Sequence, residues 1–153
     1  MPADLRDRAD VAELVTAFYR AAFDDPLIGP IFTDIAHMDL EHHLPIMCDF
    51  WETVLFDAVL YRRNALRLHA ALHARHPLQP LHFERWLALW IATVDAHFAG
   101  PVAERAKVQA QRIAGSIERR LNGGTGTVYD TILSRDRAQR IGIDTTLSGR
   151  TAP

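Results

Sequence analysis

PLHFERWLALWIATVDAHFAGP, residues 80–101, carries large apolar side chains at helical spacing. They recur every three or four residues, at Phe83, Trp86, Leu87, Trp90, Val94 and Phe98. This spacing predicts one helix over about residues 81–99. Its apolar stripe is nearly too continuous for a surface helix, so we expect the helix to lie at the centre of the core. Gly100 and Pro101 end it, and Pro101 is well placed to begin a last helix over about residues 102–121.

Helical spacing continues on the N-terminal side of this segment. Asp10 is the expected N-cap of a helix over about residues 11–24. The inner stripe of that helix comprises Val11, Leu14, Val15 and Phe18. The sequence DPLIGPIF, residues 25–32, then indicates a turn and a short helical piece.

A second long helix is expected to end near Phe56. Pro45 fits best in its first turn, where backbone N–H groups have no partner, and this places His43 at the helix start with freedom to swing. A shorter helix is expected over about residues 63–73, and strict strand-like alternation is scarce before residue 124. The sequence therefore predicts an all-α protein.

Size and composition fit one globular domain. The chain has 153 residues, of which 48% are hydrophobic and 24% charged. We expect the domain to span residues 1–121, and residues 122–153, with few large apolar side chains, to form a flexible tail. The formal net charge of −2 gives no basic surface for nucleic acid. No apolar run approaches the roughly 20 residues that a membrane span needs.

The N-terminus mixes acids with arginines and lacks the apolar stretch of a secretory signal. Cys48 is the one cysteine of the sequence, so no intrachain disulfide can form, and we expect an inert buried thiol. These features predict a cytoplasmic protein. The sequence motifs of P-loop nucleotide-binding proteins, GxSxG hydrolases, HExxH metalloproteases and EF-hand calcium sites do not occur.

Two histidines, His43 and His69, lie on separate expected helices, with Tyr19 before them and Trp86 after them. This pattern suits a flat macrocycle held between helices, with one imidazole on its iron and polar groups opposite. Imidazole is a good ligand for ferrous iron, and His69 is the best candidate because a short, tethered helix fixes which ring nitrogen faces the metal. We interpret the pattern as a haem site. The alternative for His69 is a solvated position on the surface.

Tyr19 and Trp86 are candidate hydrogen-bond donors to a ligand on the iron, because O2 on ferrous haem gains negative charge at its outer atom. Such a charge-assisted bond contributes on the order of 1.5–3 kcal/mol, enough to slow ligand escape tenfold or more. The alternative is two core aromatics with their polar tips on backbone carbonyls. His43 can donate to the ligand, act as a gate or bind the iron as a sixth ligand.

Apolar walls and cationic groups complete the expected site. The walls are Phe32, Met47 and Phe50, although a methionine at helical spacing is more often plain core. Four arginines near the His69 helix can pair with haem propionates or remain solvated, namely Arg62, Arg63, Arg67 and Arg75. His69 and His73, four residues apart, can also chelate zinc or copper, but no cysteine or carboxylate pattern completes such a site.

Six segments carry a more specific signal in their order and spacing. They are FY at 18–19, DPLIGPIF at 25–32, HLPIMCDFW at 43–51, Tyr61 to His69, HFERWLALW at 82–90 and FAGPVAERAKVQAQRIAGSI at 98–117. Together they resemble the truncated haemoglobins, specifically the third subgroup, over about residues 10–121. The glycine pairs that mark the other subgroups do not occur within residues 10–121.

The resemblance implies a globin-like, two-over-two helical sandwich around haem b. By position, His69 matches the proximal iron ligand. The distal polar residues match Tyr19, His43 and Trp86, and the pocket walls match Phe32, Met47 and Phe50. His73 is an alternative ligand, but His69 keeps the expected distance from His43 and from Tyr61.

The expected function is reversible binding of O2, and of NO or CO, with distal hydrogen bonds that favour slow oxygen release. One alternative is a NO dioxygenase or peroxidase-like haem enzyme. The chain carries no flavin or nicotinamide motif, so NO dioxygenation would need an external electron donor. A second alternative, from another class, is a haem-free sensor or interaction module with a globin-like fold.

Overall fold

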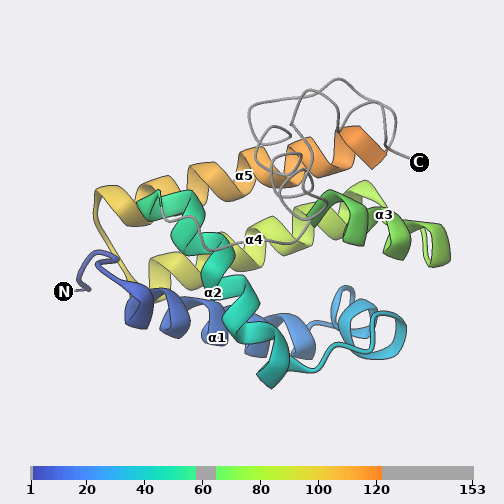
Figure 1. Cartoon of the computed structure of the whole chain (residues 1–153), viewed down its shortest axis with the longest axis horizontal. Helices are drawn as coiled ribbons and strands as arrows, with labels where there is room; N and C mark the ends of the chain where they lie inside the picture. The colour runs from blue at the N-terminus through green and yellow to red at the C-terminus, as the bar shows by residue number, and fades with distance from the viewer. Residues whose placement is uncertain (1, 58–64, 122–153) are drawn as a thin grey trace, which may run out of the picture.

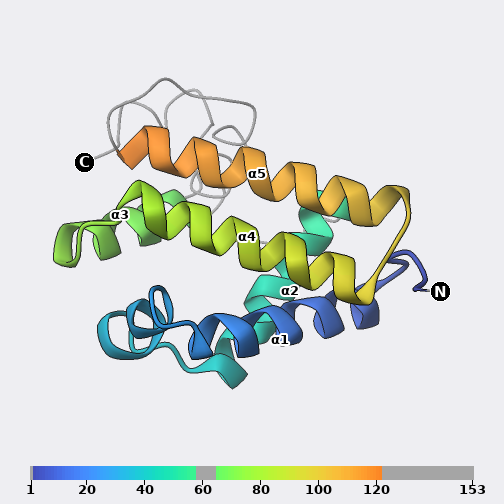
Figure 2. The same ribbon diagram turned by 180° about the vertical axis from the view of Figure 1, so that it is seen from behind.

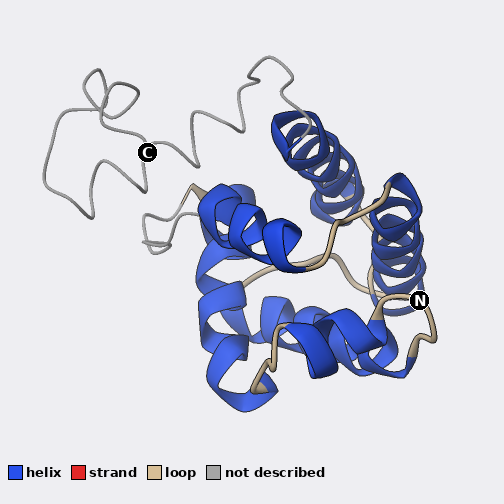
Figure 3. Cartoon of the chain, turned by 90° about the vertical axis from the view of Figure 1, so that its right-hand side faces the viewer, coloured by secondary structure: helices blue, strands red, loops and turns tan. Residues whose placement is uncertain are grey.

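The computed structural model describes residues 2–57 and 65–121. Within these ranges the chain forms helices and no strand (Figure 3). The helices are α1 (Arg8–Asp24), η1 (Ile31–Ile35), α2 (Leu40–Phe56), α3 (Ala65–Arg75), α4 (Pro80–His97) and α5 (Pro101–Leu121). The expected tail at 122–153, and the stretch 58–64 with Tyr61, Arg62 and Arg63, lie outside the described residues.

The four long helices form two packed pairs. α1 packs against α2, and α4 lies side by side with α5 (Figures 1 and 2). Contacts between α1 and α4 join the pairs, and the short α3 packs beside α5. This arrangement confirms the predicted all-α, two-over-two globin-like sandwich. No helix of the described residues is both long enough and apolar enough to cross a membrane.

The core lies where the two pairs meet. The inner stripe predicted for α1 is buried, and Trp90 and Val94 of α4 are at most 1% exposed. The buried face of α5 is built largely from alanines, at Ala103, Ala106, Ala110 and Ala114. Because alanine side chains are short, the axes of α4 and α5 can approach closely. The N-terminal half of α4 is less buried, and its Phe83 and Trp86 are only partly covered by the core.

The expected N-cap of α1 was wrong. Asp7, not Asp10, caps the helix, and its carboxylate accepts the backbone N–H of Asp10 at 3.1 Å. The Asp10 carboxylate instead accepts the backbone N–H and the Nε–H of Arg6, each at 2.9 Å. Two aspartates three residues apart both suit an N-terminus, and the pairing with Arg6 decides between them.

Pro45 also lies deeper in its helix than expected. Asp39 caps α2 and Leu40 begins it, so Pro45 is inside the helix rather than in its first turn. His43 is accordingly part of the helix, and its backbone N–H donates to the carbonyl of Asp39 at 3.0 Å. His43 is the fourth residue of α2, so it still lies near the helix start, as expected.

The turn after α1 is fastened to α4 through Asp25. Its buried carboxylate accepts the backbone N–H groups of Leu27 and Ile28 and the guanidinium of Arg85, at 2.9, 3.0 and 3.0 Å. Burial by itself would raise the pKa of Asp25, but these hydrogen bonds and the nearby charge of Arg85 lower it. The contact holds the N-terminal half of α4 against the end of α1, and Trp86 follows Arg85 directly.

Gly29 lets the same turn pass close to α1. A Cβ atom at this position would overlap the carbonyl oxygen of Phe23 and lie 3.2 Å from that of Ala22. We expect Gly29→Ala to lower the free energy of unfolding by roughly 1–3 kcal/mol, because the backbone must shift to relieve the overlap. Urea unfolding measures this effect. Gly115→Ala is the control: there a Cβ meets only the end of the Arg119 side chain, and stability should stay equal or rise slightly. Equal stability of both variants would contradict the prediction.

Candidate functional site

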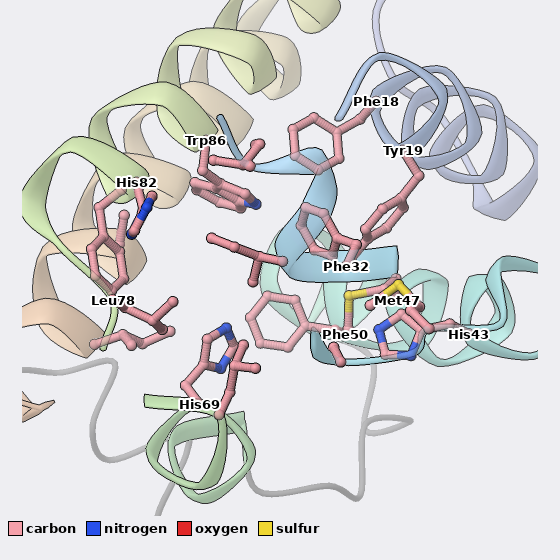
Figure 4. A pocket seen from close by; sticks show the side chains of 18 of the residues that line it. Phe18, Tyr19, Phe32, His43, Met47, Phe50, His69, Leu78, His82 and Trp86 are labelled. Carbon is pink, nitrogen blue, oxygen red and sulfur yellow. The ribbon is translucent and has the colours of Figure 1, made fainter. Parts of the chain in front are cut away.

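A mostly apolar cavity of about 480 Å³ lies between the helices and is lined from all six of them. This volume is within the range of sites that enclose a small organic molecule or cofactor. All the residues predicted for the site line this one cavity: Tyr19, Phe32, His43, Met47, Phe50, His69 and Trp86 (Figure 4). The fold therefore brings together residues that are widely separated in the sequence, from Tyr19 in α1 to Trp86 in α4.

His69 reaches the cavity from α3, and His73 does not. The His69 ring projects inward from the helix (Figure 4). His73, one turn further on, uses its Nδ1 atom to accept the backbone N–H of Leu78 at 2.9 Å, so that it closes the turn after α3. The residues that line the cavity do not include His73. Of the two histidines weighed as metal ligands on this helix, His69 is the one whose position gives access to the cavity.

Two tryptophans of α4 differ in what their indole N–H groups contact. Trp90 is buried and donates to the carbonyl of Ala106 at 3.1 Å, as expected of a core tryptophan. Trp86 stacks parallel to Trp90, with ring centroids 6.1 Å apart. Its nitrogen is directed toward the cavity interior (Figure 4), and within the described ranges no protein acceptor takes its N–H. In the described part of the chain, Trp86 thus lacks the carbonyl partner that the core alternative expects.

Tyr19 and His43 form a second polar part of the cavity wall. Tyr19 is 6% exposed, and its ring meets that of His43 edge to face at a centroid distance of 6.0 Å. The rings of Phe18 and Phe32 also contact Tyr19 edge to face, at 5.2 and 5.7 Å. These contacts fix the plane of the phenol, so its orientation is set before any ligand enters the cavity.

The three residues expected as apolar walls line the cavity. Phe32 belongs to the η1 segment and stacks on Phe23 of α1, with centroids 5.6 Å apart. Phe50 is buried on α2, and its ring meets that of Trp51 edge to face. Met47 lies nearly one turn before Phe50 in α2 and lines the same cavity.

Sequence reasoning missed His82, which lines the cavity near the start of α4 (Figure 4). Its Nδ1 atom accepts the backbone N–H of Gln79 at 2.9 Å, in a reciprocal capping box at the N-terminus of α4. Burial, and then the neighbouring His76, lower the pKa of His82. Gln79 and His82 have the spacing of a capping box, but histidine is not the usual glutamate or glutamine at this position.

Acidification should therefore destabilise the protein in part through His82. The pKa of His82 is lower in the folded than in the unfolded chain. Its contribution to stability is therefore fully present above the ordinary histidine pKa of about 6.5, and it is lost as the pH falls through the pKa of the folded state. In His82→Asn, the side-chain carbonyl oxygen can accept the same N–H. When the pH is lowered from about 7.5 to 5, we expect the free energy of unfolding of this variant to fall less than that of the wild type. Urea titrations at each pH measure the difference. His37→Asn, at an exposed site for which no ion pair is described, serves as control and should keep the wild-type dependence. Equal pH dependence in the His82 variant would count against this role.

The described residues contain no group of three or more histidine, cysteine, aspartate or glutamate side chains able to hold a metal ion.

The thiol of Cys48 is buried in the core. Burial raises the pKa of Cys48 despite the opposing charge of Arg8. These findings agree with the expectation of an inert thiol.

No family model and no curated protein sequence matches the chain. Among solved structures, the chain is similar to the crystal structure of a group III truncated haemoglobin from Campylobacter jejuni. The TM-score is 0.70 and the sequence identity 25%, over 82% of this chain and 100% of that protein. The match confirms the resemblance expected from the sequence, and the chain therefore has the truncated-haemoglobin fold, with a group III protein as its structural relative.

Proposed function

We propose that the protein binds haem b in this cavity and, through the haem iron, binds O2, and also NO and CO, reversibly. His69 is the proposed iron ligand, and Tyr19, Trp86 and His43 are the proposed distal polar groups. The proposal rests mainly on one observation: an imidazole from α3 and an indole N–H from α4 enter the same apolar cavity. Among the described residues, no acceptor takes that N–H. The similarity to a protein named as a haemoglobin supports it.

The donor set fits a metal that brings its own equatorial ligands. Imidazole is a suitable ligand for iron, and the described residues offer no cluster of three ligating side chains. A metal ion beside His69 would need further ligands from elsewhere, and a tetrapyrrole supplies four in a flat, largely apolar ring. The aromatic and aliphatic lining suits the faces of such a ring.

The proposed site residues then have defined tasks. His69 would hold the iron from α3. Ferrous haem, when bound, supplies an iron that takes up O2, NO or CO and shifts negative charge onto the outer atom of O2. Trp86 and Tyr19 can donate a hydrogen bond to that atom, and the stacking of Trp86 on Trp90 holds its N–H in the cavity. Because such bonds act mainly on the off-rate, the arrangement favours tight retention over rapid release of oxygen.

Oxygen binding is tested on the haemin-reconstituted protein after reduction under anaerobic conditions. Exposure to O2 should give a stable new absorption spectrum, and removal of O2 should restore the ferrous one. A spectrum that passes at once to the ferric form, with no reversible stage, would contradict reversible binding. Rapid turnover of NO with an added electron donor would instead identify an enzyme, a NO dioxygenase, that uses the same residues.

A further inference from the structure

We propose that Arg75, an exposed residue of α3 that lines the cavity, is the anchor for the carboxylates of the bound macrocycle. This inference rests on the proposed haem function and adds a residue that fixes the orientation of the ring. Of the four arginines expected near the His69 helix, Arg75 is the one whose side chain the structure describes. Arg75 lines the cavity together with His69.

Charge singles out Arg75. Among the described residues that line the cavity, it is the only arginine, and no lysine accompanies it. The other described basic side chains in ion pairs, such as Arg8 and Arg85, are engaged by carboxylates away from the cavity lining. Within the described ranges no carboxylate pairs with Arg75, and Asp39, which also lines the cavity, caps α2. An apolar cavity with one permanent cation at its edge suits a ligand that is apolar over its body and anionic at one side.

The position of Arg75 on its helix is also suitable. Arg75 is the last residue of α3 and lies six residues after His69, which corresponds to about 9 Å along a helix axis. Leu72, which lies midway between them, lines the cavity as well. α3 therefore presents an imidazole and a guanidinium to the same cavity, at different heights along the helix.

The guanidinium also has a contact with the η1 segment. Its Nη2 atom donates to the carbonyl of Ile35, the last residue of η1. Carbonyls at a helix C-terminus have no partner within the helix, and a cation there is favourable. Arginine has five N–H donors in a planar fork. It can therefore keep the Ile35 contact and also bind a carboxylate, so that one residue joins α3, the η1 segment and the ligand.

The test measures haemin loss to an excess of apomyoglobin, using the full-length protein loaded with haemin or with haemin dimethyl ester, which has no carboxylates. Arg75→Gln keeps an N–H donor for Ile35 but removes the charge. We expect it to speed loss of haemin about fivefold, the upper range for a partly exposed ion pair, and to leave loss of the ester unchanged. Arg75→Lys should recover part of the difference. Arg20→Gln, which removes an exposed arginine of α1 outside the cavity lining, should match the wild type with both ligands.

Unchanged haemin loss in Arg75→Gln would overturn the proposal. So would equal acceleration with haemin and with the ester, because Arg75 would then act through the protein alone. Failure of the wild type to bind either compound would overturn the haem function itself, and that outcome is distinguishable because no variant is needed to observe it.

Discussion

His69→Gly should lower the affinity for haemin by at least about 100-fold and abolish the spectrum of a histidine-bound haem. Groups that merely orient a metal ligand contribute roughly 10–100-fold to affinity, so loss of the ligand itself should exceed that range. The apolar cavity would still accept the ring, but the iron would have no protein ligand from α3. Haemin titration followed by absorption spectroscopy measures the change.

Added imidazole should restore the spectrum of the His69→Gly variant, because it can enter the space left by the side chain. His73→Ala is the matched control. It removes a histidine from the same helix, but one that accepts the Leu78 N–H and does not line the cavity. It should bind haemin like the wild type. If His73→Ala lost the spectrum and His69→Gly kept it, the assignment of the ligand would be wrong.

Loss of the distal donors should have the second-largest effect. Tyr19→Phe and Trp86→Phe should each raise the O2 dissociation rate by about tenfold or more, because each removes a hydrogen bond to a charged acceptor while an aromatic ring remains. Stopped-flow replacement of O2 by CO measures the rate. The CO dissociation rate should change less, since bound CO carries less charge.

The double variant shows whether the two donors act together. If both bond the same atom of the ligand, the effects on the O2 dissociation rate should be less than multiplicative. An unchanged rate in Tyr19→Phe with a large increase in Trp86→Phe would assign the hydrogen bond to Trp86 alone. Unchanged rates in both variants would show that neither Tyr19 nor Trp86 donates a hydrogen bond to bound O2.

The long-range geometry of the site was predictable where the helical pattern is strong. The apolar stripe of residues 81–99 indicated a central helix, and the structure buries its second half at Trp90 and Val94. The first half of the stripe has a different environment, because Phe83 and Trp86 face the cavity. A hydrophobic pattern cannot distinguish a side chain covered by protein from one that covers a cavity.

Local details depended on tertiary contacts and were not predictable from spacing. Asp7 and Asp10 are both good N-caps, and only the bonds from Arg6 to Asp10 show which one is engaged elsewhere. The capping-box spacing of Gln79 and His82 indicates a helix start but not a cavity position, because that position depends on how the start of α4 meets the other helices. Trp86 and Trp90 are alike in sequence context, and the hydrogen bond from Trp90 to the carbonyl of Ala106 distinguishes their roles.

Whether the cavity binds haem through His69 can be measured by titrating the purified protein with haemin and recording the ferric, ferrous and ferrous-CO absorption spectra. We predict saturation at one haemin per chain, and a ferrous-CO spectrum of the histidine-bound kind, in the wild type. A titration with no saturation point, and spectra identical to those of haemin in buffer, would contradict the account.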